Sequence, residues 1–351
     1  MKKVLMKGNE VIAEAALQAG CKFYAGYPIT PQNEIPEYMS KRVPDFNSIF
    51  IQAEAEISAI NMLFGASAAG FRCMTSSSSP GISLKQEGIS YLCAGELPCV
   101  IVNIVRGGPG LGNIRASQAD YFQSVKGGGH GDYHMIVIAP STLQELYDLT
   151  QNAFDYADYY RNPVMILGDG ILGQMYEPVE IKKYSPILKL PKKDFALTGC
   201  KGREPREIKT LLLNPPDLLI KHNIHLNNKY KKIEQELKLV EELQTGDAEL
   251  IIVAYGITAR IAKAAIKKAR AEGLNVGLIR PITVWPFPSE TIAKQKAKKF
   301  LAVEMSNGQL IEDVKLSLFN KTGIEVQHFG HGGGWYPSPN NIYEKIKEMM
   351  K

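Results

Sequence analysis

The sequence has five cysteines but no Cys-x-x-Cys pair, and no histidine stands at zinc-finger spacing from any of them. Disulfide frameworks and metal sites use paired cysteines, so a scattered and odd-numbered set is typical of reduced thiols. We therefore expect a cytoplasmic protein with no disulfides, no metal ligands and no iron–sulfur cluster of its own.

The sequence also lacks a long apolar run and a concentrated basic face. The longest apolar segment, Pro98–Val105, has the length of a strand, and the start MKKVLMKGNE has too few apolar residues for a secretory signal. The net charge is only +5, and the basic residues gather in Lys182–Lys232. We expect a soluble protein that binds neither membrane nor nucleic acid.

Three familiar motifs are incomplete. The loop Gly108–Gly112 lacks the G-x-G-x-x-G order of a dinucleotide site, and the run TSSSSPG lacks a nucleophile elbow. LGDG at Leu167–Gly170 lacks the later asparagine of a diphosphate–metal motif. We interpret the serines as the cap of a helix that begins near Ser83, and Asp169 as the end of a strand.

A regular alternation of strands and helices is present instead. Continuously apolar strands such as PCVIVNIVR alternate with helical segments to about residue 180, and again from Asp247. Such strands are buried on both faces, so the predicted fold class is α/β with a doubly wound parallel sheet. We predict a first domain at 1–180, an interdomain arm at 181–246 with a helix around Tyr230–Leu243, and a smaller α/β domain at 247–351.

Polar residues follow the carboxyl ends of three predicted strands, the edge at which open α/β sheets bind ligands. Thr30 in YPITP is either a substrate-binding hydroxyl or a plain helix cap. Glu56, or its neighbour Glu54, is either a cleft carboxylate or an acid favoured at a helix N-terminus. Arg106 ends the strand CVIVNIVR and could hold an anionic substrate bidentately.

Four histidines lie in glycine-rich segments. His130 and His134, in GGGHGDYH, fit a lid near this edge better than a metal site. His328 and His331, before GGGWYP, have no partner that the sequence identifies.

Together YPITP, EAEISAINMLFGASAAG, TSSSSPG and VRGGPG resemble the alpha subunit of the 2-oxoacid:ferredoxin oxidoreductases. The similarity extends to AELIIVAYGITARIAKAAIKKARAEG and LIRPITVWPFP, so it covers nearly the whole chain. Within the family, the sequence is most similar to subunits that act on branched-chain 2-oxoacids such as 2-ketoisovalerate (3-methyl-2-oxobutanoate).

The resemblance implies a thiamine diphosphate pyrimidine-binding domain followed by a transketolase C-terminal-like domain. It implies that Glu56, which has the family's E-x-x-A spacing where Glu54 does not, is the catalytic acid that contacts the aminopyrimidine ring in a desolvated cleft. Ile29 and Thr30 would contact the cofactor, and Thr30 and Arg106 the substrate. The implied reaction is coenzyme A-dependent oxidative decarboxylation of a 2-oxoacid with reduction of ferredoxin.

The implied enzyme is a hetero-oligomer. A beta subunit would hold the diphosphate and its magnesium ion, a gamma subunit would join the complex, and a ferredoxin-like delta subunit would carry iron–sulfur clusters. Two alternatives stay open: a 2-oxoglutarate-specific relative, and a non-catalytic scaffolding subunit. The basic arm would touch an acidic ferredoxin or wrap a neighbouring subunit.

Overall fold

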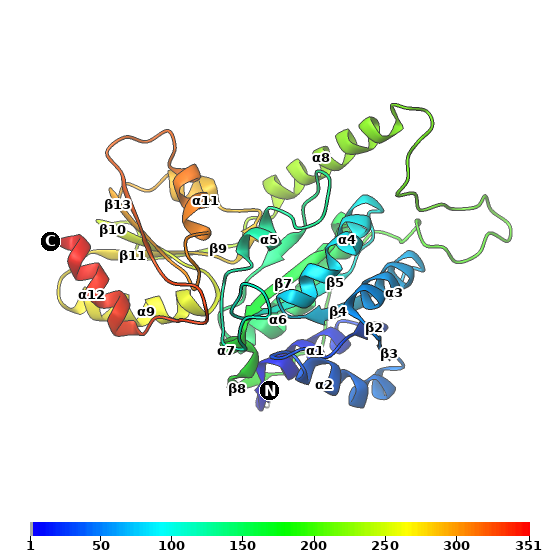
Figure 1. Ribbon diagram of the computed structural model, residues 1–351, viewed down its shortest axis with the longest axis horizontal. Coiled ribbons are helices and arrows are strands. Elements are labelled where there is room, and N and C mark those ends of the chain that lie inside the picture. Colours follow the sequence, from blue (N-terminus) through cyan, green and yellow to red (C-terminus); the bar gives the residue numbers. More distant parts are fainter. Residues whose placement is uncertain (1–2) are drawn as a thin grey trace.

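The computed structural model describes residues 3–351, and its first unit is a seven-stranded sheet between two layers of helices (Figure 1). The strand order is β12-β6-β7-β5-β4-β2-β3, and every pair is parallel except β12 with β6. The central strands β5 and β7 are buried at every position, which explains their continuously apolar sequences. The strands are β2 (Phe23–Gly26), β3 (Ile49–Gln52), β4 (Cys73–Ser77), β5 (Val100–Val105), β6 (Ile136–Ile138), β7 (Val164–Asp169) and β12 (Thr283–Trp285).

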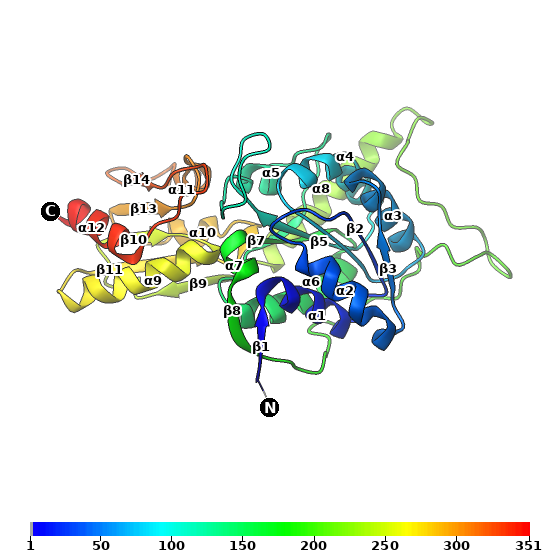
Figure 2. The same cartoon turned by 60° about the horizontal axis from the view of Figure 1, so that its bottom comes forward.

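Helices cover both faces of this sheet, as Figure 2 shows. On one face α3 packs on α4, and on the other α1 packs on α2 and α6. The α6 helix starts where Thr142 Oγ1 accepts a hydrogen bond from the Glu145 amide at 3.2 Å. The helices are α1 (Gly8–Gln18), α2 (Glu34–Arg42), a 3₁₀ turn (Val43–Phe46), α3 (Glu56–Ala68), α4 (Pro80–Ala94), α5 (Tyr121–Val125), α6 (Leu143–Tyr160) and α7 (Gly170–Gln174).

A two-stranded antiparallel ribbon lies beside this unit. It joins β1 (Lys3–Lys7) to β8 (Tyr176–Glu180), so the first described residues pair with the segment that follows α7. The sequence analysis predicted neither strand, because five-residue edge strands with polar side chains carry little periodicity.

The second unit is a five-stranded sheet of order β14-β13-β10-β11-β9, in which only β9 is antiparallel to its neighbour. Helices α9 and α12 pack together against it, and α10 contacts α11. The elements are β9 (Val240–Leu243), β10 (Leu250–Val253), α9 (Gly256–Ala271), β11 (Val276–Pro281), α10 (Ser289–Ala293), β13 (Lys299–Val303), α11 (Leu310–Ser317), β14 (Glu325–Phe329) and α12 (Pro339–Met350).

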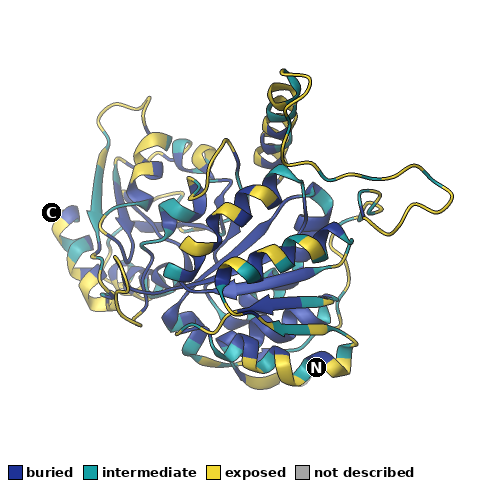
Figure 3. Ribbon diagram, turned by 45° about the vertical axis from the view of Figure 1, so that its right-hand side comes forward, coloured by how far each residue is buried: buried dark blue, intermediate teal, exposed yellow. Residues whose placement is uncertain are grey.

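Between the two units the chain runs out in a long exposed loop and returns as α8 (Leu218–Glu236), as Figures 1 and 3 show. The helix expected around Tyr230–Leu243 was therefore misplaced, since α8 ends at Glu236 and the next residues form β9. Because β9 pairs with β11, the second sheet includes a strand that lies before residue 247. The division at 180 and 246 stays a prediction.

The two units share one sheet and a set of buried hydrogen bonds. Strand β12 follows β11 in the chain but pairs with β6 of the first sheet. Within residues 3–351, every helix is too short or too polar to cross a bilayer.

Candidate active site

Four strands of the first sheet, β2 to β5, end at the same edge because they run parallel. Each is followed by a polar segment: the YPITP loop after β2, the start of α3 after β3, the serine turn after β4 and Arg106 after β5. The topology therefore gathers the candidate residues of the sequence analysis along one edge.

Glu56 is the first residue of α3, and its side chain is only 6% exposed. Its carboxylate faces α4: a Cβ placed on Gly81 would lie 2.6 Å from Glu56 Oε1 and 2.1 Å from Ser77 Oγ. The Ser77 hydroxyl is buried and has no hydrogen-bond partner. Gly81 thus leaves room for a carboxylate and an unpaired hydroxyl in a water-poor space.

Glu54 has a different environment. It is exposed, and its carboxylate accepts a hydrogen bond from Ser58 one turn along α3. That hydrogen bond lowers the pKa of Glu54. Of the two glutamates, Glu54 is the solvated acid at the helix start, and Glu56 is the one turned inward.

The serine turn between β4 and α4 is strained. Ser79 has φ of 33° and ψ of −87°, a positive-φ conformation that is rare for residues other than glycine. Its amide donates to Asn103 Oδ1 at 3.1 Å, and its Oγ accepts from the Arg106 amide at 3.0 Å. The helix begins at Pro80, not near Ser83, and Ser79 makes no side-chain cap, so the capping interpretation was wrong.

Arg106 is 7% exposed and ties two loops together. Its Nη1 donates to the Thr30 carbonyl at 2.8 Å and its Nη2 to the Leu111 carbonyl at 3.1 Å. Its Nε, also buried, has no partner. The guanidinium therefore has an unused donor at the edge where Thr30 lies.

Thr30 is exposed, and its Oγ1 has only a 3.5 Å contact from Asn33 Nδ2. Helix α2 begins at Glu34 with Asn33 before it, so Thr30 does not cap that helix. Ile29 is half-buried in the same loop, and its carbonyl accepts the Gln32 amide at 3.0 Å. The Thr30 hydroxyl is thus free for a ligand.

Two amides that the sequence analysis did not identify hold this loop. Asn9 Nδ2 and Gln174 Nε2 both donate to the Pro31 carbonyl, at 2.7 and 2.8 Å. Both also bind Glu34, which forms an ion pair with Lys7 at 2.8 Å. No local pattern marks Asn9 or Gln174, because their roles depend on α1 and α7 meeting under the loop.

Asp169 ends β7, as predicted, and caps α7. Its Oδ1 accepts the amides of Ile171 and Leu172 at 2.9 and 3.1 Å, while burial raises the pKa of Asp169 to about 6. Within residues 3–351, no three His, Cys, Asp or Glu side chains are grouped as metal ligands would be.

The histidines of GGGHGDYH lie among aromatic side chains. His134 stacks on Trp285 with ring centroids 4.7 Å apart, and burial lowers the pKa of His134. His130 Nδ1 lies 3.4 Å from Ser90 Oγ on α4. A cavity of about 670 Å³ opens between this segment and α8, and it is lined by neither Glu56 nor Arg106.

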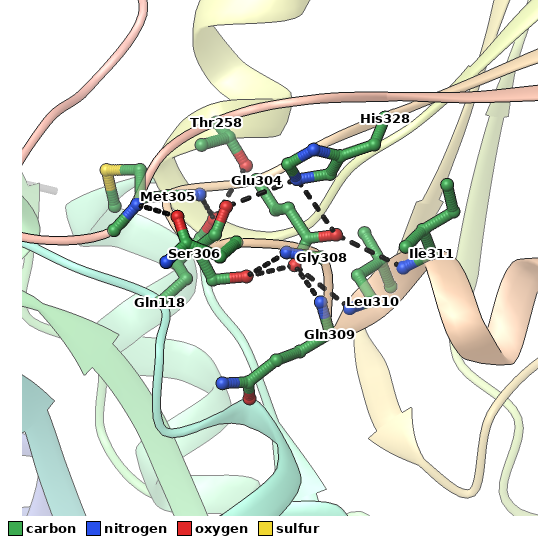
Figure 4. Close-up of polar contacts among 12 residues, drawn as sticks. Gln118, Thr258, Glu304, Met305, Ser306, Gly308, Gln309, Leu310, Ile311 and His328 are labelled. Atoms are coloured by element: carbon green, nitrogen blue, oxygen red, sulfur yellow. Dashed lines mark hydrogen bonds and ion pairs between the residues drawn. The ribbon is translucent and has the colours of Figure 1, made fainter.

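A second buried acid, Glu304, lies directly after β13 in the second unit (Figure 4). Its carboxylate accepts the amides of Gln309, Leu310 and Ile311 at 2.9 to 3.1 Å, which caps α11. His328 Nε2 lies 3.2 Å from the Ser306 carbonyl beside it, which supplies the partner that the sequence did not identify. Glu304 thus stabilises a helix start.

Gln118 connects the first unit to the segment after β13 by hydrogen bonds. Its backbone amide donates to the Met305 carbonyl, and its Oε1 accepts the Met305 amide, both at 3.0 Å (Figure 4). Its Nε2 donates to the Tyr255 carbonyl at 3.0 Å. A single buried side chain therefore bonds to the segments that follow β13 and β10.

Comparison with known proteins identifies the class. Residues 14–242 match the family model described as pyruvate flavodoxin/ferredoxin oxidoreductase, thiamine diphosphate-binding, and residues 248–342 match pyruvate:ferredoxin oxidoreductase core domain II. The chain belongs to this thiamine diphosphate-binding oxidoreductase family.

Two curated relatives narrow this class. The ketoisovalerate oxidoreductase subunit VorB of Methanothermobacter thermautotrophicus is 46% identical over 347 residues, covering 98% of this chain and 97% of its own. The 2-oxoglutarate synthase subunit KorA of Methanocaldococcus jannaschii is 39% identical, covering 90% and 92%. The chain is a subunit of a 2-oxoacid:ferredoxin oxidoreductase, as its motifs predicted.

Solved structures agree on the architecture. The 2-oxoglutarate:ferredoxin oxidoreductase of Magnetococcus marinus, solved with 2-oxoglutarate, coenzyme A and succinyl-CoA bound, has a TM-score of 0.84 and 26% identity. The match covers all of this chain and 66% of that one. A split-gene transketolase has a TM-score of 0.62 at 15% identity, a likeness of fold alone. The predicted fold class is confirmed.

Proposed function

We propose that this chain is the catalytic subunit, on the pyrimidine side, of a complex that oxidatively decarboxylates branched-chain 2-oxoacids such as 2-oxoisovalerate. The products would be an acyl-CoA and reduced ferredoxin. The observation that carries this proposal is the buried Glu56 carboxylate opposite Gly81, beside the unpaired Ser77 hydroxyl. The greater identity to the ketoisovalerate subunit than to the 2-oxoglutarate subunits supports the substrate class.

The residues present fit the polar edge of an aminopyrimidine ring. A ring nitrogen needs a carboxyl partner out of water, which Glu56 supplies, and the unpaired Ser77 hydroxyl offers a second polar contact. Ile29 supplies an apolar contact and Thr30 a hydroxyl from the loop after β2. When bound, thiamine diphosphate supplies the nucleophilic carbon that attacks the oxo group.

The substrate would lie at the mouth of this edge. Arg106 offers an unused Nε to the carboxylate of a 2-oxoacid, and the Thr30 hydroxyl is exposed beside it. Glu56 would hold the proton shared with the ring and orient the ring toward the substrate.

The remaining parts of the reaction belong to partner subunits in this proposal. A beta subunit would bind the diphosphate and magnesium, and gamma and ferredoxin-like delta subunits would complete the complex, the delta subunit with iron–sulfur clusters. The names of the relatives as subunits support such an assembly. The basic arm would contact ferredoxin or a neighbouring subunit.

The test is co-expression with the neighbouring subunits, followed by measurement of 2-oxoacid- and coenzyme A-dependent reduction of a viologen dye. Glu56→Gln should lower turnover by about 100-fold or more, because a positioned acid contributes that much. Glu54→Gln is the matched control, since Glu54 is exposed, and it should keep wild-type turnover.

Each alternative has its own outcome in this assay. A scaffolding subunit would retain full turnover with Glu56→Gln. A complex that turns over 2-oxoglutarate but not 2-oxoisovalerate would identify the 2-oxoglutarate-specific relative, which the KorA proteins represent.

A further inference from the structure

Lys85 is a buried lysine that the proposed function leaves without a role. It lies in the second turn of α4 and is fully buried. Its Nζ donates to Thr75 Oγ1 at 2.6 Å and to the Ser76 carbonyl at 3.1 Å, both in β4. Burying an ammonium group is costly unless a negative charge lies near it. Two neutral acceptors alone do not supply that charge.

Glu56 is the acid whose charge affects the pKa of Lys85. Burial lowers the pKa of the Lys85 ammonium to about 7, and the Glu56 charge opposes this lowering. Gly81 precedes Lys85 by one turn of α4, so the two positions share a face of the helix. The Glu56 carboxylate lies against that same face, at the place where Gly81 has no Cβ. The ammonium and the carboxylate therefore lie along the same face of α4, and their charges interact without a direct hydrogen bond between them.

The other charged groups of this edge are engaged elsewhere. The guanidinium of Arg106 donates to the carbonyls of Thr30 and Leu111. Asp120 accepts from Asn103 Nδ2 at 2.9 Å. Lys85 therefore faces hydroxyl and carbonyl oxygens from β4 and the Glu56 carboxylate from α3.

We propose that Lys85 is a positioning residue for Glu56, the buried positive charge that holds this carboxylate directed across Gly81 at the cofactor ring. The inference rests on the function proposed above. Lys85 acts through Glu56, because its own hydrogen bonds go to Thr75 and Ser76. No bond forms or breaks at Lys85.

The first test is a double-mutant cycle on the thermal unfolding of the full chain. Lys85→Met leaves Glu56 as a buried acid without a counter-charge. Because the pKa of Lys85 is lowered to about 7, the ammonium is charged at about pH 6 and mostly neutral at about pH 8.5, so the part of the Tm loss that depends on Glu56 should be larger at about pH 6. This Glu56-dependent part is the difference between the Tm loss that Lys85→Met causes in the wild type and the loss it causes in a chain that already carries Glu56→Gln. Additive effects at both pH values would overturn the proposal.

Lys229→Met is the matched control for this cycle. Lys229 is also largely buried, but it lies on α8 and pairs with Glu96 at 3.3 Å. Its substitution should lower Tm equally whether residue 56 is glutamate or glutamine.

The second test follows hydrogen–deuterium exchange at the thiazolium carbon of thiamine diphosphate bound to the assembled complex. Removing a buried positive charge raises the proton affinity of a ring that is held nearby. Lys85→Met should shift the acid limb of the pH–rate profile up by about one unit, a tenfold slower exchange on the acid side. Lys85→Arg keeps the charge and should restore the wild-type limb, and Lys229→Met should leave it unmoved.

The failures of the two proposals are distinguishable. If Glu56→Gln exchanges as fast as the wild type, the proposed function itself is wrong. If Glu56→Gln abolishes exchange but Lys85→Met leaves the acid limb in place, only the role of Lys85 is refuted.

Discussion

Gly81 is the position at which the smallest change should cause the most selective loss of activity. An alanine Cβ there would stand 2.1 Å from Ser77 Oγ and 2.6 Å from Glu56 Oε1, where ordinary contacts begin at 3.4 Å. The Glu56 carboxylate would therefore have to move by about 0.8 Å. A displacement of that size would take the carboxylate out of the position proposed for its contact with the ring.

The size of the effect follows from this displacement. A shift of about 1 Å in a positioned group can cost about 100-fold in rate, so Gly81→Ala should lower kcat by about that factor. Stability should fall by only about 1–3 kcal/mol, because the obstructing atoms are side-chain ends and Gly81 is in a helix. The assay is viologen reduction by the assembled complex, with thermal unfolding of the same preparation.

Gly65→Ala is the control, since a Cβ at Gly65 of α3 meets nothing within 4 Å. It should retain full activity and stabilise the chain by about 0.5–1 kcal/mol, because alanine favours a helix over glycine. Wild-type kcat in Gly81→Ala, or an equal loss in both variants, would refute the reasoning.

Two further substitutions test the buried ion pairs of Arg280 and the proposed substrate contact of Arg106. Arg280→Met should cost about 2–3 kcal/mol in urea unfolding at neutral pH, because Arg280 is buried between Glu145 and Glu241, with Nη1 and Nε at 3.0 and 2.6 Å from their carboxylates. Burial acts to raise the pKa of Glu145, but hydrogen bonds from Arg280 and Ser141 hold it below its usual value. This stabilisation is therefore present above about pH 4.3 and is lost as the pH falls below it, so the unfolding free energies of the variant and the wild type should converge in acid. A difference in unfolding free energy that stays constant with pH would contradict this explanation. Arg106→Met should raise KM for the 2-oxoacid by about 10- to 100-fold with unchanged cofactor affinity, and an unchanged KM would remove Arg106 from the substrate site.

The sequence predicted those parts of the fold that local patterns determine. The apolar runs of β5 and β7 predicted a parallel sheet. The choice of Glu56 over Glu54 came from the family resemblance and its E-x-x-A spacing; Glu56 is buried and Glu54 is exposed. The serine turn was misread, because Ser79 has a positive φ and its hydrogen bonds, to Asn103 Oδ1 and from the Arg106 amide, join it to residues that are distant in the sequence.

Local sequence patterns could not predict contacts between distant segments of the chain. Lys85 in an otherwise apolar helix face gave no sign that Glu56 would lie opposite it, because the two come from different helices. The pairing of β12 with β6 was likewise unpredictable, since three residues carry no periodicity and their partner lies in the other unit. The roles of Glu56, Thr30 and Arg106, and the domain division, stay predictions.

The crossing of β12 into the first sheet has a consequence for synthesis on the ribosome. The edge of that sheet beside β6 stays uncovered until Thr283–Trp285 has emerged, more than a hundred residues after β7 is complete. A nascent chain of the first 180 residues therefore exposes an unpaired edge, the kind of surface that invites wrong pairing or chaperone capture. A truncation at residue 180 should yield an aggregation-prone fragment, whereas one that ends after Trp285 retains the strand that closes the sheet.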